Sequence, residues 1–187
     1  MATFDTDEFL AACRDAARET DARYAVRELL QRTMASPGDV AEAMRPEMGG
    51  LTLLHQADDL TIVHVVWAPG MRIYPHDHRM WAVIGIYDGQ EDNSFYRRAE
   101  ADRRQLVESG GKELRAGDVL TLGDDTIHAV ANPTTRLTGA IHIYGGDFVN
   151  EPRSQWGPGP MEERPHDYAV TLEQFAEANR AWLARTS

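Results

Sequence analysis

Apolar residues recur at three-to-four spacing in residues 9–13 and again in 24–30, a pattern typical of amphipathic helices. The sequence Ser36-Pro37-Gly38-Asp39 predicts the start of a further short helix. Serine is a common helix cap, proline fits the first helical position, and an acidic residue suits the positive end of a helix. The segment 1–48 is therefore predicted to be helical.

From about Leu51 the pattern changes to short runs rich in Val, Ile, Thr and Tyr, which are typical of strands. Turn signals separate these runs at Pro69-Gly70, Asp88-Gly89, Gly110-Gly111, Gly117-Asp118 and Gly123-Asp124. Their spacing predicts a compact antiparallel barrel or sandwich over residues 49–148.

The remaining segment, 149–187, is different again. Asn150 to Pro165 is rich in Pro and Gly and is expected to wrap the surface. Thr171-Leu172-Glu173-Gln174 matches a capping box and predicts a final helix towards Leu183. Because the length suits one ordinary domain, we expect residues 1–187 to form a single, mainly β domain with helices at both ends.

Composition and charge limit the partners. The chain is 42% hydrophobic and 26% charged, and its apolar stretches are too short to cross a membrane. A net charge of −11 would repel nucleic acids and anionic membranes. The acidic amino terminus does not resemble a secretory signal, and Cys13, the single cysteine, cannot form a disulfide within the chain. We expect a cytoplasmic monomer or homodimer that acts on a small molecule.

Three histidines are candidate metal ligands. His76 and His78 lie between the Pro69-Gly70 turn and an apolar run, near the start of a predicted strand. Residues two apart on a strand face the same way, so both imidazoles could reach one ion. His128, in another strand-like segment, can supply a third ligand. An H-x-H pair alone is a weak signal, because histidines also occur as packed or surface residues.

The residues around these histidines resemble the two motifs of the cupin superfamily. The first motif is matched by Gly70, His76, His78 and Gly89. The second is matched at its full spacing by Gly117, Gly123, Asp125, His128 and Asn132. The family usually has Pro in place of Gly123 and Gly in place of Asp125. The resemblance implies a double-stranded β-helix, the jelly-roll barrel of cupins, in which the three histidines hold one divalent metal.

The first cupin motif commonly has a Glu four or five residues after its second His, where this sequence has Ala82 and Val83. Three neutral imidazoles would leave the charge of the ion uncompensated and leave coordination positions open on one side. Such a site suits an anionic ligand. We expect iron(II), with nickel, manganese or zinc as alternatives; zinc would activate water without redox chemistry.

His142 and Tyr144 form a second candidate pair. They are two residues apart in a strand-like segment, and a His beside a Tyr hydroxyl can orient or polarise it. The alternative is a buried Tyr bonded to a core His. Together with Trp67 and the three histidines, Ala140–Tyr144 resembles the thiol dioxygenases, the cysteine dioxygenase-like cupins, over about residues 51–148.

This resemblance implies a reaction and its catalytic residues. In that family three histidines hold iron(II), a small thiol binds as its thiolate beside dioxygen, and both oxygen atoms end on sulfur as a sulfinate. The family motif Ser-x-His-x-Tyr places the Tyr hydroxyl near the substrate. His142 and Tyr144 match it and are the candidate catalytic residues, while Ala140 replaces the Ser.

The substrate is less well defined by the sequence. Cysteine dioxygenase binds the substrate carboxylate with an Arg on the strand before the metal motif, and residues 51–56 contain none, which makes cysteine a poor candidate. Arg72 would share strand parity with Tyr74 and His76 and is a candidate substitute, although a solvent-facing Arg is commoner. Trp67 and Tyr74 are further candidate pocket residues. A cationic or neutral thiol, such as cysteamine or a thiol betaine, would suit an acidic protein.

Two other functions remain open. A cupin dioxygenase could cleave a carbon–carbon bond in an enolic or phenolic substrate, and His142 and Tyr144 would then be packing residues. A non-oxidative zinc cupin, an isomerase or a small-molecule binding module, would show no oxygen chemistry. No role is assigned to His166 in the Pro-rich tail, and Glu91-Asp92-Asn93 is interpreted as a solvated acidic turn.

Overall fold

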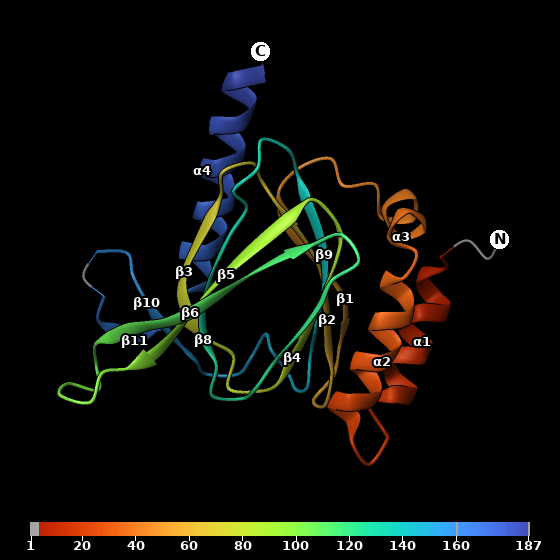
Figure 1. Cartoon of the computed structure of the whole chain (residues 1–187), viewed down its shortest axis with the longest axis horizontal. Coiled ribbons are helices and arrows are strands. Elements are labelled where there is room, and N and C mark those ends of the chain that lie inside the picture. The colour runs from red at the N-terminus through yellow and green to blue at the C-terminus, as the bar shows by residue number, and fades with distance from the viewer. Residues whose placement is uncertain (1–3, 160, 187) are drawn as a thin grey trace.

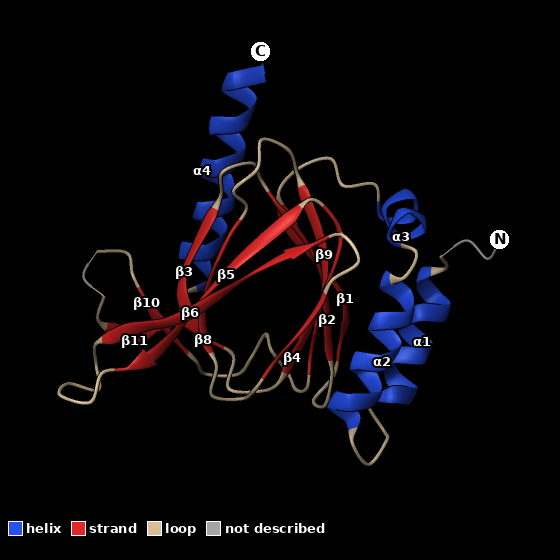
Figure 2. Ribbon diagram, viewed as in Figure 1, coloured by secondary structure: helices blue, strands red, loops and turns tan. Residues whose placement is uncertain are grey.

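The computed structural model describes residues 4–159 and 161–186, and it consists of two antiparallel sheets with helices at both ends of the chain (Figure 1). The outer ends of the predicted segments 1–48 and 149–187, residues 1–3 and 187, lie outside the described residues. Figure 2 shows the strands gathered between the amino-terminal helices on one side and α4 on the other.

The amino-terminal segment forms three helices, α1 (Thr6–Ala16), α2 (Ala22–Met34) and α3 (Pro37–Met44). At the start of α1 the side chain of Asp5 accepts a hydrogen bond from the backbone amide of Glu8. Asp21 caps α2 in the same way, through the backbone amide of Tyr24. The third helix begins at Pro37, as predicted, with Ser36 in the cap position.

The first sheet has the strand order β1-β2-β9-β4-β7. Its members are β1 (Gly50–Gln56), β2 (Thr61–Trp67), β9 (Thr138–Tyr144), β4 (Ala82–Asp88) and β7 (Val119–Leu122). The second sheet has the order β11-β10-β3-β8-β5-β6. Its members are β11 (Glu163–Pro165), β10 (Ser154–Trp156), β3 (Arg72–Asp77), β8 (Ile127–Ala131), β5 (Gln90–Arg98) and β6 (Leu106–Arg115).

Strand β9 is buried on both faces, and its alternating side chains separate two apolar clusters. Ile141 and Ile143 pack against the helices, whereas Ala140 and Tyr144 belong to the cluster inside the barrel. Because side chains alternate along a strand, His142 must point the same way as Ala140 and Tyr144. The helical layer thus determines which face of β9 supplies the site.

The segment predicted to wrap the surface contributes two strands to the second sheet. Strand β10 pairs with β3, with Gln155 opposite His76, and residues 153–156 are buried. The last helix, α4 (Tyr168–Thr186), begins before the predicted capping box at Thr171. It starts earlier because the Asp167 carboxylate accepts a hydrogen bond from the backbone amide of Ala169. None of the described helices combines the length and apolar character that a membrane crossing requires.

Candidate metal centre

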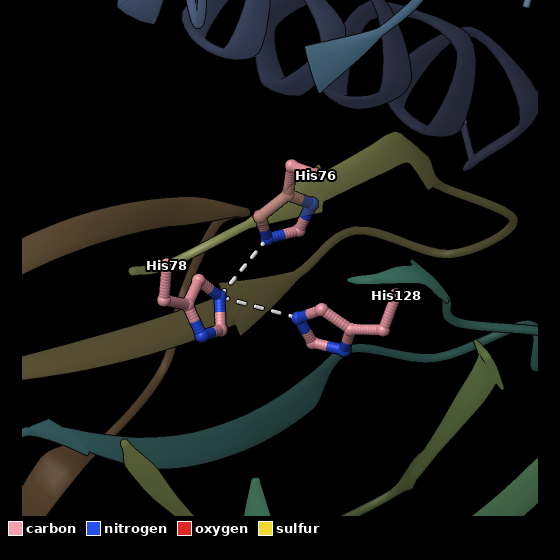
Figure 3. Close-up of side chains that lie close together, drawn as sticks. All are labelled: His76, His78 and His128. Atoms are coloured by element: carbon pink, nitrogen blue, oxygen red, sulfur yellow. Dashed lines mark hydrogen bonds between the residues drawn. The ribbon is translucent and has the colours of Figure 1, made fainter. Parts of the chain in front are cut away.

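The three predicted ligands converge on one point (Figure 3). His76 lies on β3 directly opposite His128 on β8, and His78 follows the end of β3. The Nε2 atom of His78 lies 3.2 Å from the Nε2 atom of His76 and 3.2 Å from that of His128. The candidate ligand nitrogens all lie within 4.8 Å of one another. Among the described residues, no carboxylate joins this cluster.

Hydrogen bonds behind two of the rings determine which nitrogen faces the centre. The Nδ1 atom of His76 lies 3.0 Å from the carbonyl oxygen of Tyr74, which can only accept. The Nδ1 atom of His128 lies 2.7 Å from Oδ1 of Asn93. Both rings therefore carry their proton on Nδ1 and direct the Nε2 lone pair inward, as metal ligands require. The Nδ1 atom of His78 is buried without a hydrogen-bond partner among the described residues.

Burial keeps these imidazoles neutral. It lowers the pKa of His76 to about 4, against the opposing effect of the hydrogen bond to Tyr74. Burial also lowers the pKa values of His78 and His128 well below the ordinary value, and the neighbouring histidines add to this effect. Three neutral imidazoles with converging lone pairs fit a divalent ion such as iron, nickel or zinc. The cluster could therefore hold one metal ion.

The segment Glu91-Asp92-Asn93 is not a solvated turn; that interpretation is wrong. It lies in β5, with Glu91 fully buried and Asn93 2% exposed. Gly89, with a φ of 79°, makes the turn into β5, so that β5 enters the other sheet and faces the barrel interior. Glu91 accepts hydrogen bonds from Trp67 at 2.6 Å and Asn93 at 2.9 Å.

His142 and Tyr144 point into the barrel beside the cluster, as their shared strand face predicts. The Nδ1 atom of His142 lies 3.1 Å from the Tyr144 hydroxyl oxygen. The Tyr144 ring meets His78 edge-on, with centroids 5.0 Å apart, and stacks on Phe148 at 3.9 Å. Burial raises the pKa of Tyr144, so its hydroxyl keeps its proton at neutral pH and can donate it.

A cavity of about 50 Å³ opens in front of the three histidines. His142, Tyr144, Trp67 and Tyr74 line it with the ligands, so both predicted aromatic pocket residues reach it. A larger hollow of about 840 Å³ adjoins it, and Phe148 is among the residues that line both. The small inner cavity has room only for a small molecule.

The proposed role of Arg72 is wrong. Its side chain is exposed and does not line the cavity, although its backbone oxygen accepts the Gln174 amide at 2.8 Å. The β3–β8 register shifts between Ile73 and His76. Such an irregularity breaks the simple alternation along β3, so Arg72 does not share the face of His76.

Arg153 and His166 are cavity residues that the sequence did not reveal. Arg153 is 9% exposed, donates to the Phe148 carbonyl at 2.6 Å, and lies 3.4 Å from Nε2 of His166. Its Nε atom has no hydrogen-bond partner and it forms no salt bridge within the described residues. Burial lowers its pKa. Only the pairing of β10 with β3 brings Arg153 to the cavity, and no local pattern signals that pairing.

Other histidines and the cysteine lie away from the centre. His64 is bonded through Nε2 to the Tyr87 hydroxyl at 2.6 Å. Cys13 packs between the helices and the first sheet, where burial raises its pKa to about 12. Neither they nor His55 line the cavity.

Comparisons with known proteins bear on the fold. No family model matches the sequence. Among solved structures, the chain is similar to BH2720 from Bacillus halodurans, with a TM-score of 0.50 and 13% identity, covering 72% of this chain and 90% of that one. It is also similar to a cupin family protein with a double-stranded β-helix fold from Methanocaldococcus jannaschii, with a TM-score of 0.46 and 10% identity, covering 55% and 84%.

A third similar structure is an uncharacterized conserved protein with a double-stranded β-helix domain from Klebsiella pneumoniae. Its TM-score is 0.45 at 17% identity, and the match covers 62% of this chain and 87% of that one. Identities this low concern the fold alone. The structure itself shows a mainly β chain with two antiparallel sheets and helices at both ends, as the sequence predicts.

Proposed function

We propose that this chain is an iron(II)-dependent dioxygenase that oxidises a small thiol to its sulfinic acid, RSH + O2 → RSO2H. The observation that carries the proposal is the joint presence, in one small cavity, of three neutral histidines without a carboxylate ligand and of the His142–Tyr144 pair. A neutral ligand set favours binding of an anion such as a thiolate. The resemblance of the same residues to the thiol dioxygenases supports the proposal.

Arg153 indicates the class of thiol. It is a buried cation at the cavity wall without a salt bridge in the described chain, and its Nε group is left without an acceptor. A buried guanidinium is stabilised by a planar anion that accepts two hydrogen bonds, which a carboxylate can do. We therefore assign the substrate carboxylate to Arg153.

The same cavity offers a positively charged substrate group no carboxylate among the described residues that line it. An ammonium or quaternary ammonium group placed there would lose its hydration and face Arg153. The structure thus favours a mercaptocarboxylate over cysteamine, a thiol betaine or cysteine itself, and it argues against the cationic thiols that the sequence favoured.

The protein residues have separate tasks in this reaction. When bound, iron(II) would supply the centre at which the thiolate and dioxygen meet. Arg153 would hold the carboxylate at the far end of the substrate, so that the sulfur lies near the histidine cluster. Tyr144 would donate the single proton of its hydroxyl either to Nδ1 of His142 or to a group bound in the cavity. Phe148 and Trp67 would exclude water.

Oxygen uptake by the iron-loaded protein tests the proposal. Mercaptoacetate and mercaptopropionate are compared with mercaptoethanol and cysteamine, which resemble them in size but lack the carboxylate. We expect oxygen consumption and a sulfinate, detected by mass with isotopically labelled O2, for the carboxylates only. Uptake with none of the thiols would reject the thiol assignment. Uptake with all four thiols at equal efficiency would reject only the role of Arg153 in binding the carboxylate, and the thiol assignment would stand.

A further inference from the structure

Glu91 is a carboxylate with no access to solvent, and it lies where two chains of hydrogen bonds meet. One oxygen, Oε2, accepts from the Trp67 indole at 2.6 Å and lies 3.3 Å from Nε2 of His142. The other, Oε1, accepts from the side-chain amide of Asn93 at 2.9 Å. Neither Glu91 nor these three neighbours belongs to the metal cluster.

These contacts keep the carboxylate charged. Burial by itself would raise the pKa of Glu91, but the hydrogen bonds from His142, Asn93 and Trp67 outweigh it and hold the pKa below its ordinary value. An ionised carboxylate has no proton to donate, so each of its neighbours must be a donor.

The first chain leads from Glu91 to Tyr144. Since Glu91 can only accept, Nε2 of His142 must carry a proton. The ring then presents Nδ1 to the Tyr144 hydroxyl, 3.1 Å away. Ala140 has no polar side chain to hold this imidazole from its own strand, and the group that holds it comes instead from β5.

The second chain leads from Glu91 to a metal ligand. Asn93 donates its NH2 group to Glu91, so its oxygen faces the other way, 2.7 Å from Nδ1 of His128. An amide oxygen can only accept, so His128 must carry its proton on Nδ1. Its Nε2 lone pair is left free to face the centre.

We propose that Glu91 is a positioning residue that determines the proton positions of two histidines at once, His142 directly and His128 through Asn93. One buried charge thereby prepares a metal ligand and the acid–base partner of Tyr144. The consequence for Tyr144 rests on the proposed function, whereas the proton positions do not.

Imidazole NMR of the metal-free full chain tests the proposal, because long-range proton–nitrogen couplings show which ring nitrogen carries the proton. We expect a proton on Nε2 of His142 and on Nδ1 of His128. A bare Nε2 in His142, or a protonated Nε2 in neutral His128, would overturn the proposal. This measurement needs no variant, so it decides even if substitutions impair folding.

Glu91→Gln should reverse the direction of the hydrogen bonds that lead from residue 91 through Asn93 to His128. The Trp67 indole can only donate, so the Gln oxygen must take the Oε2 position and the Gln amide must face Asn93. Asn93 then turns its own NH2 group towards His128, and the His128 proton moves to Nε2. Outer-shell changes of this kind weaken metal affinity about 10- to 100-fold, which a cobalt(II) titration measures. The His142 Nε2–H resonance should also shift, because its acceptor loses its charge.

Two further variants distinguish the hydrogen bonds that lead from Glu91 to His128 from those that lead to His142. Asn93→Ala should disturb His128 and weaken cobalt(II) binding while the His142 resonances stay as in the wild type. Tyr87→Phe is the matched control, since it removes the buried Tyr87–His64 hydrogen bond on the other side of the sheet and should change none of these signals. Unchanged His128 protonation and cobalt(II) affinity in Glu91→Gln would overturn the proposal. Failure of thiol oxidation would leave it standing, because no readout here is turnover.

Discussion

His76 and His128 are direct partners across the antiparallel β3–β8 ladder, so their imidazoles lie side by side on one face of the second sheet. Their ring centroids are 4.7 Å apart. Opposed residues of an antiparallel pair have their Cβ atoms about 4.5–5.5 Å apart, a spacing that lets two imidazoles share one ion. His78 then needs only to turn in from the end of β3 to complete the cluster.

Replacing His128 with Ala should abolish metal retention, because two remaining imidazoles without a carboxylate are too few ligands for stable binding. Metal content per chain, measured after purification and dialysis, should fall to background. His64→Ala is the control: it removes a buried histidine outside the cavity and should keep the metal. Full metal content in the His128 variant would refute the ligand set.

Arg153→Gln should raise the KM for a mercaptocarboxylate. Hydrogen bonds to charged groups contribute about 1.5–3 kcal/mol, which corresponds to a loss of about 10- to 150-fold in kcat/KM. Steady-state oxygen uptake measures it. The exposed Arg72 provides the control, and Arg72→Gln should leave kcat/KM within about twofold of the wild type, because surface substitutions have small effects.

Tyr144→Phe should lower kcat while cobalt(II) affinity stays unchanged, because the hydroxyl is not a metal ligand. Loss of a proton donor typically costs about 10²–10⁴-fold in rate. Single-turnover oxygen consumption isolates this effect from product release. Tyr87→Phe removes a buried hydroxyl outside the cavity and should retain the wild-type rate. A Phe variant at position 144 with full activity would show that the hydroxyl takes no part.

The metal-free protein should lose stability as the pH falls from about 6.5 towards about 4. Burial lowers the pKa of His76 from 6.5 to about 4, and that of His166 to about 3. Each of these histidines has a pKa of 6.5 in the unfolded chain and a lower pKa in the folded chain, so between these two values only the unfolded chain binds the proton. The stabilisation is therefore complete above pH 6.5 and decreases below it. Urea unfolding across this pH range measures the slope.

His166→Asn gives this prediction a control. The substitution removes one of the histidines whose pKa is lowered by burial and keeps the three candidate ligands, so the stability profile should become shallower below pH 6.5. A wild-type free energy of unfolding that stays constant from pH 7 to pH 4 would contradict the prediction.

Local patterns in the sequence predicted much of the fold. The spacing of apolar residues predicted the helices before Gly50 and the strand-rich region after it, because burial of one face imposes a period on each element. Turn glycines and the two histidine motifs predicted the antiparallel strands and the three candidate ligands. The same alternation placed His142 and Tyr144 on one face of β9.

Other features depended on contacts between distant segments. Arg153 reaches the cavity only because β10 pairs with β3, and Glu91 is buried only because β5 joins the second sheet beside β8. The sequence around each residue is polar or rich in Pro and Gly, which is typical of exposed loops.

The sequence by itself determined the candidate ligands, three imidazoles without a carboxylate at the family's usual place, since residue types and strand alternation are local properties. Only the tertiary structure decided which charges accompany that centre: the Arg153 cation at the cavity wall and the Glu91 anion behind His142. The physical reason is that burial of a charge is costly unless a partner compensates it, and partners from distant strands meet only in the folded chain.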